Sequence, residues 1–127
     1  MIKTNSLNIQ VRDSFSGRLF GALGKCRLDS RDALWLSPCS AVHTFGMQEP
    51  MSLVFLDQQL RPMRVISDAW PNRLYRCRGA WSVVEMARKT EQALTQITTE
   101  LASLGSRIHM QEYIHVGRIK ARIEYAA

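Results

Sequence analysis

Two cysteines and a histidine are the clearest set of side chains in this sequence that could do chemistry. Cys39 and His43 are separated by three residues, and Cys77 falls on a later predicted strand. Thiolate and imidazole groups are ligands that zinc accepts, and Met47 or water could complete the coordination. Strong zinc patterns contain two closely spaced ligand pairs, and this chain has one. The structural alternative is that the cysteines are small buried apolar side chains and that His43 hydrogen-bonds a backbone carbonyl.

Cys39 also suggests a second chemistry, nucleophilic catalysis, with His43 as the base and Glu85 orienting it. This mechanism needs an exposed thiol with a lowered pKa, and the nearby arginines flank Cys77 instead. We therefore expect no catalytic residues and no cofactor. Zinc bound by Cys39, His43 and Cys77, or a thiol-dependent activity, is the alternative.

Positive charge is concentrated in one part of the chain. The formal net charge is +6 over 127 residues. Between residues 61 and 89 the sequence contains seven cationic side chains and only two carboxylates. Such a region can attract an anionic ligand, an acidic protein or nucleic acid, or can simply be the solvated face of strands. Nucleic acid is the least favoured partner, because stacking aromatics do not alternate with the arginines. The predicted binding site is this basic rim with its neighbours: His43, Met47, Glu85, Arg61, Arg64, Arg76 and Arg78.

Short strands must position these residues. Their pattern predicts strands at 7–11, 33–36, 51–56, 63–66, 74–77 and 81–86, separated by turn-forming residues. The spacing leaves no room for crossover helices, so we expect a curled sheet or barrel-like core. Residues 39–47 are expected to form a loop or short strand that enters this sheet. Three tryptophans are expected to pack in the core, and the alternative is that they line a ligand groove: Trp35, Trp70 and Trp81.

Two helices are predicted beside the strands. Asp13 can cap a short helix over 14–23. A longer helix of roughly 15 residues follows Thr90, with Gly105 at its end. Its apolar stripe recurs at steps of three and four residues: Leu94, Ile97, Leu101 and Leu104. The chain then closes with a long strand over 107–125, bulged at Gly117.

Several motifs resemble those of a known bacterial family, the domain of unknown function numbered 192. The matching segments lie within residues 10–89: Arg18–Gly24, Pro38-Cys39, His43–Met47, Phe55–Asp57, Cys77–Ala80 and Val83–Glu85. The resemblance implies a compact β-rich domain without an agreed activity, some of whose relatives are associated with secretion or pilus assembly. This chain departs from the family in two places. Ser52 stands where an aspartate is usual, and residues 90–125 replace a short Gly-rich tail.

The sequence therefore predicts one domain of mainly β, α+β class. Its parts are a short N-terminal helix, a curled sheet or barrel-like core, and a longer C-terminal helix followed by a bulged strand. The family-like core covers residues 10–89, and the extension covers 90–127. We expect a non-enzymatic binding or assembly-accessory domain that takes an anionic ligand or acidic partner. The sequence shows no secretory leader and no membrane-spanning segment, so a cytoplasmic location is expected.

Overall fold

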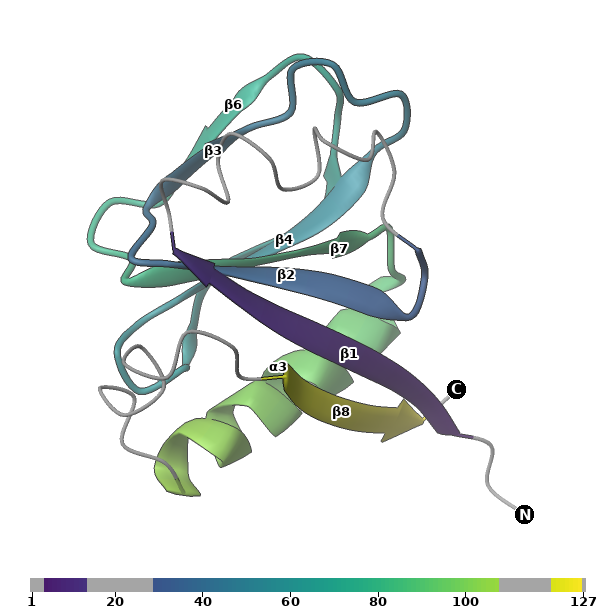
Figure 1. Cartoon of the computed structure of the whole chain (residues 1–127), viewed down its shortest axis with the longest axis vertical. Coiled ribbons are helices and arrows are strands. Elements are labelled where there is room, and N and C mark those ends of the chain that lie inside the picture. The colour runs from purple at the N-terminus through teal and green to yellow at the C-terminus, as the bar shows by residue number, and fades with distance from the viewer. Residues whose placement is uncertain (1–3, 14–28, 108–119, 127) are drawn as a thin grey trace.

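The computed structural model describes residues 4–13, 29–107 and 120–126, which form three layers (Figure 1). A curled six-stranded sheet is the middle layer. Helix α3 (Glu91–Arg107) covers one face, and a two-stranded ribbon lies over the other. The predicted class, mainly β with a curled sheet and a C-terminal helix, is confirmed. The predicted helix over 14–23 and the bulge at Gly117 lie outside the described residues.

The six-stranded sheet has the order β5-β4-β7-β2-β1-β8. Its strands are β1 (Thr4–Asp13), β2 (Asp32–Ser37), β4 (Met51–Leu56), β5 (Pro62–Ala69), β7 (Ser82–Ala87) and β8 (Lys120–Ala126). Neighbouring strands pair antiparallel, except for β1 and β2, which are parallel. The predicted strands that belong to this sheet are therefore confirmed: 7–11, 33–36, 51–56, 63–66 and 81–86.

The ribbon pairs β3 (Ala41–His43) with β6 (Leu74–Arg76) in antiparallel register. The prediction that residues 39–47 enter the central sheet is wrong, because β3 belongs to this separate sheet. Both edges of β2 and of β4 are already paired with other strands, so β3 has no free edge beside either of them. The ribbon instead packs across the sheet.

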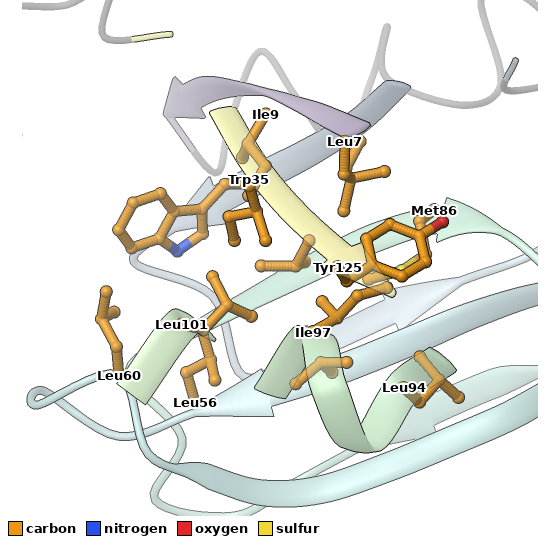
Figure 2. Packing of buried hydrophobic residues seen from close by; sticks show 14 residues of the cluster. Leu7, Ile9, Trp35, Leu56, Leu60, Met86, Leu94, Ile97, Leu101 and Tyr125 are labelled. Carbon is orange, nitrogen blue, oxygen red and sulfur yellow. The ribbon is translucent and has the colours of Figure 1, made fainter. Parts of the chain in front are cut away.

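Apolar side chains form one cluster on each face of the sheet. The helix-face cluster, shown in Figure 2, includes Leu7, Ile9, Trp35, Leu56, Met86 and Tyr125 against Leu94, Ile97 and Leu101 of α3. The ribbon-face cluster includes Leu34, Leu36, Met51, Leu53, Phe55 and Val83 against Cys39, Val42 and Met47. Because both faces are covered, every residue of β4 is buried and the strand is mostly apolar in sequence.

Helix α3 is fixed at both ends by specific contacts. Thr90 caps its start, because its Oγ1 accepts a hydrogen bond of 3.1 Å from the backbone N–H of Ala93. Gly105 does not end the helix as predicted but lies in its last turn. A Cβ at Gly105 would lie 2.0 Å from the carbonyl oxygen of Gln59. Glycine is therefore needed for the close approach of α3 to the loop between β4 and β5.

Candidate binding surface

The three predicted metal ligands do not form a site. Cys39 is buried, and its Sγ donates to the carbonyl oxygen of Ala41 at 3.1 Å. Cys77 is half-buried against the ribbon-face cluster, and His43 stacks on Phe45 with ring centroids 5.1 Å apart. Among residues 4–13, 29–107 and 120–126, no group of three His, Cys, Asp or Glu side chains could hold a metal ion. The described residues therefore give the zinc alternative no support.

His43, Met47 and Glu85 also do not share one accessible pocket or face. Met47 and Glu85 are 7% and 5% exposed. Met47 packs in the ribbon-face cluster together with Val42 of β3. Side chains alternate along a strand, so His43, next to Val42, lies on the outer face of the ribbon. The ribbon thus separates His43 from the two buried residues.

Glu85 is a carboxyl group in an apolar environment. Its partners in register are Leu34 on β2 and Leu53 on β4, which place it on the ribbon face of the sheet. Burial raises the pKa of Glu85 to about 7, because the charged form loses its hydration. A salt bridge between Glu85 and a nearby arginine is not formed among the described residues.

The predicted basic rim is only partly assembled. Arg61 lies apart from the ribbon, and its Nε pairs with Oδ2 of Asp57 at 3.1 Å in the loop between β4 and β5. Arg64 reaches from β5 to the ribbon, where its Nη1 donates to the carbonyl oxygen of Arg76 at 2.6 Å. The exposed arginines on or beside the ribbon are Arg64, Arg73, Arg76 and Arg78.

At one end of the ribbon, Thr44 joins two loops that are distant in sequence. Its buried Oγ1 donates to the carbonyl oxygen of Trp70 at 2.6 Å and accepts from the backbone N–H of Arg73 at 2.9 Å. The Thr44 carbonyl accepts from the N–H of Asn72 at 2.9 Å, and the Asn72 side chain accepts from the N–H of Gly46 at 3.1 Å. Asn72 and Gly46 have φ values of 61° and 83°, which these residue types tolerate well. The two loops therefore form one hydrogen-bonded platform.

This platform carries three large apolar side chains that remain in solvent. Phe45, Trp70 and Leu74 are 52%, 53% and 57% exposed. Leu74 lies opposite His43 in register, and Arg76 lies opposite Ala41, so all four share the outer face of the ribbon. We call this surface the ribbon tip: His43, Phe45, Trp70, Arg73, Leu74 and Arg76.

The sequence did not reveal the apolar part of the ribbon tip. Trp35 and Trp81 pack edge to face with ring centroids 6.4 Å apart, but the prediction that Trp70 is also a core residue is wrong. A signal was present, because Trp70 directly precedes Pro71 and Asn72 in a predicted turn. Such connections run over the surface and rarely reach a core.

Comparison with known proteins supports the fold. No protein-family model and no curated protein matches the chain. A "putative transcription regulator" from Sinorhizobium meliloti 1021 is similar in structure, with a TM-score of 0.60 and 12% identity, over 74% of this chain and 88% of that chain. A protein of unknown function from Novosphingobium aromaticivorans DSM 12444 has a TM-score of 0.56 and 11% identity, over 91% of this chain and 73% of that chain. At these identities the likeness shows a shared fold.

The structure also bears on membrane association. Within the described part of the chain, no helix combines the length and the apolar character that crossing a bilayer requires.

Proposed function

We propose that this protein is a non-enzymatic binding domain that docks an acidic segment of a protein partner, with apolar anchor residues, on its ribbon tip. One observation carries the proposal. Phe45, Trp70 and Leu74 are exposed on a hydrogen-bonded platform beside arginines.

The composition of the ribbon tip matches that of energetically important interface residues. Tryptophan, tyrosine and arginine dominate such positions, and phenylalanine is enriched in interface cores, because these side chains offer a large contact area. Trp70, Phe45 and the arginines fit this composition, whereas Leu74 contributes apolar area alone. The hydrogen bonds of Thr44 hold the backbone of both loops, so less conformational entropy is lost when a partner binds. The arginines favour a partner that carries Asp or Glu, and they make association depend on salt.

Protein is a better match than nucleic acid for this surface. Leu74 is the most exposed of the three apolar residues, and an aliphatic side chain provides no stacking platform for a base. The protein from Sinorhizobium meliloti shares the fold at 12% identity. Its naming as a transcription regulator applies to that protein and gives no support for nucleic-acid binding by this chain. An association with secretion or pilus assembly is a prediction from the resemblance alone. A cytoplasmic location likewise remains part of the proposal.

A selection from random peptides tests this function although the natural partner is unidentified. Displayed peptides of about 12 residues are long enough to cross a surface of this kind. Selection on the wild-type protein is expected to enrich peptides that combine Asp or Glu with aromatic or aliphatic residues. Two variants, Trp70→Ser and Arg76→Glu, should each lose these peptides. Arg61→Glu is the matched control, because it reverses the charge of an exposed arginine that lies away from the ribbon tip. This variant should still bind the selected peptides.

Two outcomes would overturn the proposal. One is the enrichment of peptides that bind Trp70→Ser and Arg76→Glu as well as the wild type. The other is tight binding of duplex DNA that Arg76→Glu abolishes while no acidic peptide is enriched.

A further inference from the structure

A separate hollow lies on the other side of the sheet, where α3 begins. Its volume is about 340 Å³, within the range of small-molecule sites. The described residues that line it come from β1, β8, α3 and the segment before α3: Asn5, Arg88, Lys89, Thr90, Gln92, Ala93, Gln96 and Tyr125. We call this hollow the α3 pocket.

The charged residues among these lining residues are both cations. Arg88 pairs with Asp68 through Nε, which leaves its two terminal nitrogens for a ligand. The Nζ of Lys89 donates to the carbonyl oxygen of Ser30 at 2.8 Å, so Lys89 acts on the pocket through its charge. The nearest acidic residue of the helix, Glu91, lines a different hollow between α3 and β5. Two carboxylates partly offset these charges, because Asp68 pairs with Arg88 and Asp29 acts on Lys89. Neither aspartate lines the pocket, so the charged groups of its lining are cations, which favour an anion.

The backbone adds to this preference. The first-turn N–H groups of α3 carry partial positive charge, and the cap from Thr90 engages the N–H of Ala93. The other lining side chains on β1 and α3 are largely neutral amides, which can donate and accept hydrogen bonds: Asn5, Gln92 and Gln96.

Tyr125 adds an accessible hydroxyl to the lining of the α3 pocket. Its side chain is 7% exposed and packs in the helix-face cluster (Figure 2). Its hydroxyl has no protein hydrogen-bond partner among the described residues and is not one of the buried unsatisfied polar atoms, so it is open to water or to a ligand. Because Tyr125 lines the α3 pocket, a bound molecule can supply that partner. Burial also raises the pKa of Tyr125, so the hydroxyl keeps its proton at neutral pH and can donate it to an oxyanion.

We infer that the α3 pocket binds a small phosphate monoester with a polar body. The phosphate oxygens would lie between Arg88 and the first turn of α3. The body would lie against the amides of Asn5 and Gln92 and the hydroxyl of Tyr125. This inference does not depend on the ribbon tip, which lies across the sheet.

A titration of the ¹⁵N-labelled full chain with glycerol 3-phosphate tests the inference by NMR. The side-chain amide signals of Asn5, Gln92 and Gln96 are direct reporters. We expect saturable shifts of these signals, with affinity about tenfold weaker in Arg88→Gln and severalfold weaker in Tyr125→Phe. Arg61→Gln is the matched control, because Arg61 also pairs with an aspartate through Nε but lies away from the pocket. It should bind like the wild type.

The outcomes that contradict the inference are equally specific. Shifts that do not saturate up to about 10 mM would show that no site exists at a meaningful affinity. Equal affinity of the wild type and Arg88→Gln would place the anion elsewhere. Equal affinity for inorganic phosphate would remove the role of the polar body. Trp70→Ser should not alter this titration, so failure here is distinguishable from failure of the proposed function.

Discussion

Thr44 donates a hydrogen bond of 2.6 Å to the carbonyl oxygen of Trp70, although 26 residues separate the two. The N–H of Trp70 is satisfied as well, because it donates to the hydroxyl of Tyr75 at 2.7 Å. Both backbone groups of Trp70 are thus held within the platform while its indole stays half exposed. The ribbon tip depends on this fixed backbone.

Replacing Thr44 by valine should lower the free energy of unfolding by about 2 kcal/mol, as measured by urea denaturation. Valine keeps the shape of the side chain but leaves the Trp70 carbonyl and the Arg73 N–H without their partner. Thr99→Val is the control. The hydroxyl of Thr99 is exposed on α3 and bonds a carbonyl of the same helix, so its loss should be nearly neutral. Equal losses for the two variants would show that the Thr44 hydroxyl does not stabilise the platform.

The raised pKa of Glu85 predicts that the free energy of unfolding falls as the pH rises. In the native state the pKa is about 7, against an ordinary value of 4.5. Between these values the native carboxyl holds its proton while the unfolded one is ionised, so unfolding releases a proton and rising pH favours it. The contribution of the protonated Glu85 carboxyl to the free energy of unfolding is complete below pH 4.5 and is lost as the pH rises to about 7. The change amounts to about 3 kcal/mol.

Denaturation curves recorded across this pH range check the Glu85 prediction. Glu85→Gln cannot ionise and should flatten the dependence. Glu100→Gln, a substitution at an exposed position of α3, should leave the dependence unchanged. A wild-type stability that rises between pH 4.5 and pH 7 would contradict the assignment of Glu85 as a buried neutral acid.

Gly105→Ala should destabilise the protein, although alanine favours helices by about 1 kcal/mol over glycine. The added Cβ would meet the carbonyl oxygen of Gln59 at 2.0 Å and the Cβ of Leu60 at 2.9 Å. We expect a net loss of at least about 2 kcal/mol in thermal or urea unfolding. Glu100→Ala, on the exposed face of the same helix, is expected to change stability little. A stabilised Gly105→Ala variant would mean that α3 does not approach the loop between β4 and β5 so closely.

Ser52 is expected to be structural. It is fully buried, and its hydroxyl donates to the carbonyl oxygen of Ser67 and accepts from the N–H of Lys89, both at 2.9 Å. Ser52→Ala should cost about 2 kcal/mol in urea denaturation, because both partners are left unpaired. Ser52→Asp should cost more, since an ionised aspartate cannot donate to Ser67. A Ser52→Asp protein as stable as the wild type would contradict this assignment.

The sheet and the long helix could be predicted because their information is local. The alternation in residues 7–11 and the stripe of Leu94, Ile97 and Leu101 each reflect the face that a single element buries. The position of Gly105 could not be predicted correctly, because its reason lies in contact with Gln59, which is distant in sequence. In the sequence, a glycine near the end of an apolar helical stripe is equally consistent with a cap that ends the helix and with a close contact inside it.

The candidate site was less predictable for the same reason. Arg61 and Arg64 are close in sequence, but one is held by Asp57 and the other reaches the ribbon. His43 and Met47 are four residues apart, yet the ribbon places them on different sides. The exposure of Trp70 follows from a long-range hydrogen bond to Thr44, which no local pattern encodes.

The central claim is that the ribbon tip is the binding surface, and the indole signals of the protein test it most directly. The chain contains three tryptophans, which give three indole N–H signals in a ¹⁵N spectrum, assignable by single substitutions. A peptide from the proposed selection should shift the Trp70 signal in a saturable way, and the affinity should fall as salt rises. The signal of Trp35, which is buried on the helix face, should stay in place. A bound peptide that leaves the Trp70 signal unmoved, or an affinity independent of salt, would contradict the account.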